Sequence, residues 1–190
     1  MSKLIAHLQE QGYVNGTNDK IVSTGLKRLK SLLCDIAFSL LLGLLLGDLL
    51  AGLLFELSYS IVRIYAGGYH ASTERICIWL TYISTLLCIV LIFYLPLIPI
   101  AMNILLGISI VVLFVCSPVE NANKPLNQRE KEVYRKKCLF TTLLEALLYT
   151  VFLLARAPLY AKAVCFALAM VALGQIMDCL QHISKRQLKH

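Results

Sequence analysis

The chain has 190 residues, of which 58% are hydrophobic and only 15% are charged. Ordinary soluble domains carry about 25% charged residues, and a soluble fold of this size has too little interior to bury so much apolar surface. The formal net charge is +7. In so apolar a chain, a basic excess is typical of membrane orientation rather than of nucleic-acid binding. The composition predicts an all-α polytopic membrane protein, with one domain over residues 1–190 and no nucleic-acid partner.

Residues 1–30 precede the long apolar sequence. Two amphipathic stretches lie in this segment, one at residues 4–8 and a more basic one at residues 21–29. Such stretches are typical of helices that lie in the membrane interface, and a solvated arm is the alternative. We expect amphipathic interfacial helices before the first span.

The apolar sequence from residue 32 to about residue 64 is too long for one span. A single helix of that length would measure about 48 Å at 1.5 Å per residue, against a hydrocarbon core of about 30 Å. We therefore expect two short spans that meet at Gly47-Asp48. Two further hairpins follow, with turns near residues 96–99 and 156–158. The six predicted transmembrane helices cover residues 32–46, 49–64, 76–95, 99–116, 138–155 and 160–180.

The Lys and Arg residues test this topology. If both termini are cytoplasmic, sixteen of the eighteen fall on the inner side, and only Arg156 and Lys162 lie outside. A single span over residues 32–64 would place the basic stretch 124–137 outside, against the positive-inside rule. The charge distribution therefore predicts six spans with both termini in the cytoplasm.

Four carboxylates fall within the predicted spans, namely Asp35, Glu56, Glu145 and Asp178. A carboxylate in hydrocarbon costs roughly a few kcal/mol unless it is paired or hydrated. We favour contacts between helices, or a wet groove, for these residues. The alternative is a small transporter or channel whose path they line, although the chain lacks the paired broken helices typical of transporter sites.

The inner loop between the second and third spans holds a cysteine and a histidine at close spacing. On one straight helix the Cα atoms of His70 and Cys77 would lie about 10.5 Å apart, too far for a thiol–imidazole hydrogen bond. Gly67-Gly68 favours a break in the helix. We therefore expect a glycine turn that carries His70, then a new helix with Ser72 or Thr73 as N-cap and Cys77 near its start.

This placement favours a reactive cysteine. A helix N-terminus and a neighbouring imidazolium both favour the thiolate, which is the nucleophilic form. The Cys77 thiolate formed beside His70 can then attack a peptide carbonyl and form a thioester. Arg63 and Glu74 belong to the same loop. The alternative is an interfacial histidine beside an inert cysteine. The four histidines supply no four-ligand zinc cluster and no cofactor motif is found, so we predict neither a metal nor a cofactor.

The second inner loop, residues 117–126, reads S-P-V-E-N-A-N-K-P-L and leads into a basic run. Its prolines and asparagines favour a rigid turn. The basic run can dock an acidic peptide or anionic lipid, and the alternative is that it serves only as the positive-inside signal. The candidate residues of this region are Glu120, Asn123, Lys124, Arg135, Lys136 and Lys137.

Together the two loops resemble the accessory gene regulator B (AgrB) family, the membrane cysteine endopeptidases of Gram-positive peptide quorum sensing. The resemblance rests on Arg63, on the G-G-Y-H-A stretch at residues 67–71, on Cys77 seven residues after His70, and on the S-P-V-E-N-A-N-K-P-L turn. Chain length and the six-span layout extend it over nearly the whole sequence.

The resemblance implies an enzyme that processes a short pro-peptide with an amphipathic leader, a central cysteine and an acidic tail. Cys77 would attack at the junction with the tail, and His70 would act as general base and then as acid. A substrate thiol would capture the acyl group and give a cyclic thiolactone. Glu74 and Glu120 are candidates for a third orienting group, and Arg63 would steady the loop or hold an acidic substrate group.

The implied partners are the pro-peptide and membrane lipid, a homodimer is left open, and the implied location is the bacterial cell membrane. A transporter and a non-catalytic membrane scaffold both predict that Cys77→Ser leaves function intact. The enzyme hypothesis predicts that this substitution abolishes cleavage.

Overall fold

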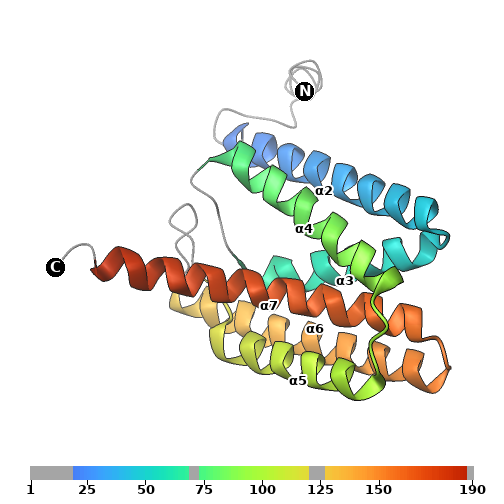
Figure 1. Cartoon of the computed structure of the whole chain (residues 1–190). Helices are drawn as coiled ribbons and strands as arrows, with labels where there is room; N and C mark the ends of the chain where they lie inside the picture. Colours follow the sequence, from blue (N-terminus) through green and yellow to red (C-terminus); the bar gives the residue numbers. More distant parts are fainter. Residues whose placement is uncertain (1–18, 69–72, 120–126, 188–190) are drawn as a thin grey trace. The chain divides into compact units, whose positions relative to one another are not determined.

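The computed structural model describes residues 19–68, 73–119 and 127–187, and the side chains of residues 22–68, 73, 75–119 and 127–181. Six helices and no strand occur in this part of the chain (Figure 1). They are α2 Asp19–Leu46, α3 Leu49–Ala66, α4 Glu74–Tyr94, α5 Pro99–Cys116, α6 Gln128–Leu154 and α7 Pro158–Gln187. Each is long and apolar enough to cross a membrane, so the predicted six-helix fold is confirmed and the chain is a multi-pass membrane protein.

Two helices, α2 and α6, begin ten or more residues before the predicted spans. α2 is continuous from Asp19, so the basic stretch 21–29 continues the helix of the first span and forms no separate helix. α6 begins at Gln128, where the Glu130 carboxylate accepts the N–H of Asn127 at 2.9 Å. Lys, Arg and Glu are good helix formers, so a helix continues past the apolar residues that mark its span. Residues 1–18, with the first amphipathic stretch, lie outside the described residues.

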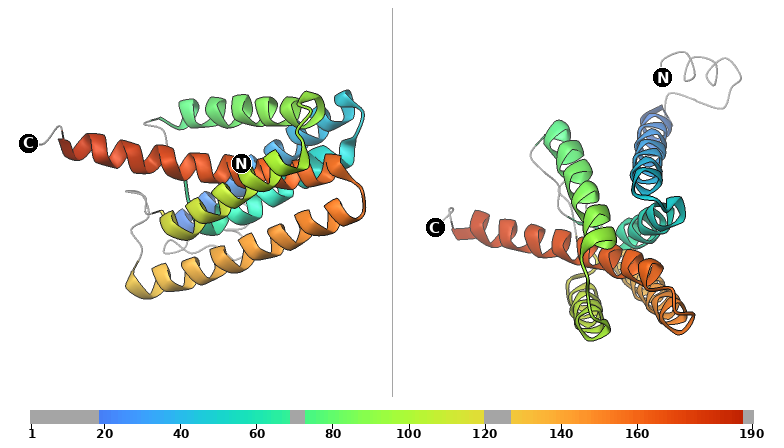
Figure 2. Two further views of the ribbon diagram at one scale, coloured as in Figure 1. Left: turned by 60° about the horizontal axis from the view of Figure 1, so that its bottom comes forward. Right: turned by 45° about the vertical axis from the view of Figure 1, so that its right-hand side comes forward.

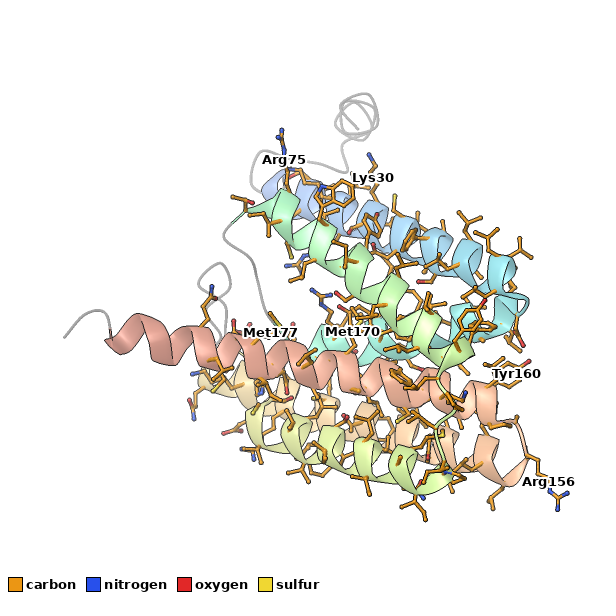
Figure 3. All side chains as sticks on the ribbon, viewed as in Figure 1. Lys30, Arg75, Arg156, Tyr160, Met170 and Met177 are labelled. Atoms are coloured by element: carbon orange, nitrogen blue, oxygen red, sulfur yellow. The ribbon has the colours of Figure 1, made fainter. Side chains whose placement is uncertain are left out.

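The turns between helices fall where the sequence predicts them. Gly47 separates α2 from α3 with a φ of +104°, and the Asp48 carboxylate caps α3 by accepting the N–H of Ala51 at 3.0 Å. α4 ends at Tyr94 and α5 begins at Pro99. The α6–α7 turn contains Arg156, whose side chain extends from the end of the bundle in Figure 3. The residues of each turn therefore determine where one helix ends and the next begins.

The contacts divide the chain into two units, Met1–Ala37 and Phe38–His190. In the first unit, the described part is the N-terminal portion of α2, where the Ser31 hydroxyl donates to the Asp35 carboxylate at 3.4 Å. Most side chains of this portion are exposed. The second unit contains the helix bundle described below.

Within the second unit, α7 is the central helix. It packs against α3, α4, α5 and α6, and it lies between α4 on one side and α6 on the other (Figure 1, Figure 2). Small residues allow helices in membranes to approach closely. The fully buried residues of α7 include Ala161, Ala163, Val164, Cys165, Ala167 and Leu168.

Three of the intramembrane carboxylates belong to the second unit, and all three are buried. Glu56 on α3 accepts hydrogen bonds from Ser39 of α2 and from Ser60, both at 2.9 Å. This carboxylate therefore joins α2 to α3, which is the helix-to-helix role that the sequence favoured. Glu145 lies on α6 and Asp178 on α7.

Candidate functional site

A cavity of about 160 Å³ opens between α3, α4 and α7. Figure 3 shows Met170 and Met177 on the edge of α7 that faces α4. The residues that line the cavity are Tyr59, Arg63, Gly67 and Gly68 from the end of α3, Cys77, Leu80, Thr81 and Ser84 from α4, and Met170, Val171, Leu173, Gly174 and Met177 from α7. Four residues predicted from the sequence are thereby brought together: Arg63, Gly67, Gly68 and Cys77.

Cys77 lies in the first turn of α4. Thr73 is the N-cap of this helix, because its hydroxyl accepts the N–H of Ile76 at 3.4 Å and its carbonyl accepts the N–H of Cys77 at 3.1 Å. The predicted helix start is therefore confirmed at Thr73. The half-buried thiol of Cys77 forms no disulfide, and it lies at the end of a helix that favours negative charge. Among the lining residues that the structure describes, Cys77 is the only cysteine.

Two glycines form the corner where α3 ends. Gly67 has a φ of +74°, a backbone conformation that residues other than glycine rarely adopt. A Cβ at this position would lie 2.7 Å from the carbonyl oxygen of Val119. Around Gly68, by contrast, a Cβ would meet nothing within 4 Å. The predicted glycine turn is present, and Gly67 is the position that requires glycine.

A buried glutamine links this corner to the second motif loop. Gln175 of α7 is fully buried, and its Nε2 donates to the Ala66 carbonyl at 3.0 Å and to the Ser117 hydroxyl at 2.6 Å. The N–H of Val119 donates to the same Ala66 carbonyl at 3.0 Å. Gln175 is not among the residues predicted from the sequence, although a single amide within an apolar span is a usable signal of a specific contact.

Arg63 faces both the cavity and an aromatic ring. Its Cζ lies 5.1 Å from the ring centroid of Tyr59, in a cation–π arrangement. Both residues are on α3 and both line the cavity. The Arg63 guanidinium therefore lies beside the cavity that contains Cys77, and its supporting role stays a prediction.

The basic residues of α6 do not line the cavity. The Nζ of Lys137 lies 5.5 Å from the ring centroid of Tyr65 near the end of α3, and that ring packs edge-on against Tyr134 at 6.2 Å. Arg135 and Lys136 are exposed. The N-terminal part of α6 therefore contacts the end of α3 through Lys137 and Tyr134.

Several predicted site residues lie outside the described residues: His70, Glu120, Asn123 and Lys124. Of Glu74, the described part is the backbone, which begins α4. The pairing of Cys77 with His70 therefore stays a prediction. Within the described ranges, no group of three or more His, Cys, Asp and Glu residues is arranged to hold a metal ion.

A family model described as accessory gene regulator B (AgrB) matches residues 1–180. The match includes every residue that lines the cavity and both loops that carry the sequence motifs. No curated protein and no solved structure matches this chain.

Proposed function

Because the chain belongs to the accessory gene regulator B family, we propose that it is the cysteine endopeptidase of an accessory gene regulator quorum-sensing system. The observation that carries this proposal is the position of Cys77, in the first turn of α4 and in the wall of a cavity. We place this cavity at the cytoplasmic face of a bacterial cell membrane, with both termini on that side.

In the first step, the Cys77 thiolate attacks the carbonyl carbon at the junction with the acidic tail of a short pro-peptide. His70 takes the thiol proton and then gives it to the nitrogen of the departing tail. The C–N bond breaks, and the leader with the central segment is left as a thioester on Cys77. The positive end of α4 favours the negative charge of the attacking thiolate.

In the second step, a thiol of the bound peptide loses its proton to His70 and attacks the thioester carbonyl. A new C–S bond closes the thiolactone ring and the bond to Cys77 breaks. His70 then returns the proton to the Cys77 sulfur, which restores the thiol of the enzyme. Because one thioester replaces another, ring closure needs no ATP and no cofactor.

The cavity wall suits such an intermediate. The hydroxyl of Thr81 donates to the Cys77 carbonyl at 3.0 Å, and that of Ser84 donates to the Leu80 carbonyl. Both hydroxyl donors on the α4 side are thus used within the helix, and the remaining lining is mainly apolar. An apolar wall reduces access of water, which would hydrolyse the thioester.

The cavity volume limits what can enter it. Pockets for drug-sized ligands usually measure about 300–1,000 Å³, whereas this cavity measures about 160 Å³. We infer that it takes one or two apolar side chains of the peptide beside the scissile bond. The exposed Arg135 and Lys136 would attract the acidic tail outside it, and the amphipathic leader would lie in the lipid interface.

Co-expression with a short pro-peptide that has an amphipathic leader, a central cysteine and an acidic tail tests the proposal. Mass spectrometry should detect the released tail with the wild-type chain, and no tail with Cys77→Ala. Cys88→Ala is the matched control, because Cys88 lies on the same helix but outside the cavity lining, and it should cleave as the wild type does. Continued cleavage by Cys77→Ala would refute the proposal.

A further inference from the structure

Gln175 is a fully buried amide on the central helix α7. A buried amide in a membrane-spanning helix is unfavourable unless its groups are hydrogen-bonded. Its Nε2 donates to the Ala66 carbonyl at 3.0 Å and to the Ser117 hydroxyl at 2.6 Å, while its Oε1 is buried without a partner. The hydrogen bonds of this side chain are therefore made by its Nε2 donor.

The two acceptor groups lie at the C-terminal ends of two other helices. Ala66 is the last residue of α3, where carbonyls have no partner within the helix, and its carbonyl also accepts the N–H of Val119. Ser117 is the C-cap of α5, and its hydroxyl oxygen accepts the Cys138 thiol of α6 at 3.2 Å. The Gln175 amide therefore joins α7 to the ends of α3 and α5, and Ser117 joins the same junction to α6.

This junction is one peptide unit from the cavity. Gly67 and Gly68 follow Ala66 directly and line the same cavity as Cys77. On α7, Gly174 precedes Gln175 and lines the same cavity. A shift of the Ala66 carbonyl relative to α7 therefore changes the position of the glycine wall relative to the cysteine.

We propose that Gln175 is a positioning residue, which holds the Gly67–Gly68 wall of the cavity in place against Cys77 through the Ala66 carbonyl. The proposal rests on the proposed function, in which Cys77 is the nucleophile. When the Gln175 amide is removed, the Ala66 carbonyl keeps its hydrogen bond from the Val119 N–H, so the fold is retained. The carbonyl loses its bond to α7, so the Gly67–Gly68 segment is held less firmly. The effect then falls on the reactivity of Cys77 rather than on stability.

The test follows the alkylation of Cys77 by iodoacetamide as a function of pH, in the full chain in lipid nanodiscs with mass-spectrometric detection. Gln175→Met keeps the length of the side chain and removes its donor. We expect Gln175→Met to be alkylated at pH 7 at least tenfold more slowly than the wild type. Its pH profile of alkylation should move toward that of His70→Ala. Its helix content and Tm should be unchanged. A Gln175→Met profile identical to that of the wild type would overturn the proposal.

Further variants separate the possible outcomes. Ser117→Ala removes the second acceptor and should give a smaller shift that is not additive with Gln175→Met. Gln175→Leu also removes the donor and serves if Gln175→Met does not fold, and an unchanged profile then overturns the proposal. Ser109→Ala is the control, because it removes a buried hydroxyl that bonds only within α5, and it should leave the profile unchanged.

Failure of the proposed function has a different signature. If the wild type and His70→Ala are alkylated identically at every pH, the Cys77–His70 pair is wrong and the inference about Gln175 falls with it. If those two profiles differ but Gln175→Met matches the wild type, only the positioning role is refuted.

Discussion

The backbone N–H of Val119 donates a 3.0 Å hydrogen bond to the carbonyl of Ala66. This bond joins the loop that follows α5 to the glycine corner that follows α3, although the two segments are far apart in the sequence. The described parts of the two motifs that carry the family resemblance therefore meet at Gly67 and Val119. Changes in one loop should consequently affect the other.

Gly67→Ala tests this coupling. The φ of +74° is unfavourable for alanine, and the added Cβ would lie 2.7 Å from the Val119 oxygen. A strained backbone residue of this kind costs about 1–3 kcal/mol. We expect a lower Tm in thermal unfolding and loss of cleavage. Gly68→Ala is the matched control for stability, because its Cβ meets nothing within 4 Å; an equal loss of Tm in both variants would contradict this explanation.

Thr73→Ala tests the helix start at Cys77. The substitution removes the hydroxyl that accepts the Ile76 N–H, and loss of an N-cap costs about 1 kcal/mol. Because the first turn of α4 carries Cys77, we expect slower cleavage in a time course with the co-expressed pro-peptide. Thr73→Ser retains the cap and should retain most of the rate. If both variants cleave equally fast, the cap does not contribute to the site.

Met170→Trp tests whether the peptide enters the cavity. The larger side chain fills part of the space between α4 and α7, so we expect KM for the pro-peptide to rise at least tenfold. Leu180→Trp places the same side chain at an exposed position of α7 and should leave KM near the wild-type value. An unchanged KM for Met170→Trp would show that the substrate binds elsewhere.

Neutralising Arg135 and Lys136 tests the docking of an acidic tail. Both are exposed, so Arg135→Gln with Lys136→Gln should leave Tm unchanged and slow cleavage. Salt should also slow the wild type, since the screening length falls from about 10 Å at 0.1 M to about 3 Å at 1 M. Arg156→Gln, at the α6–α7 turn, is the control. Equal cleavage by the double variant and the wild type would exclude this dock.

Local patterns were sufficient to predict much of the fold. The break at Gly47-Asp48, the cap at Thr73 and the glycine corner at Gly67 each depend on residues within one or two turns of the chain. The lengths of the apolar segments and the distribution of Lys and Arg residues predicted the six helices. The early start of α6 was missed because charged helix formers continue a helix beyond its apolar part.

The contacts of Gln175 could not be predicted in this way. Its acceptors are 109 and 58 residues away in the sequence, and no short-range pattern encodes such a distance. Likewise, the sequence placed Arg63 and Cys77 in one loop, but the contribution of α7 to the cavity depends on how the helices pack. Packing between distant helices therefore determines the part of the site that sequence analysis missed.

The central claim is that Cys77 forms a thioester with the pro-peptide, and a trapped intermediate tests it most directly. The wild-type chain is co-expressed with a pro-peptide whose own cysteine is replaced by alanine, so that no thiol can close the ring. Intact-mass and peptide analysis should then show a hydroxylamine-sensitive adduct on Cys77, with the mass of the pro-peptide without its tail. Release of the tail with no adduct on Cys77, or with the adduct on another cysteine, would contradict the account.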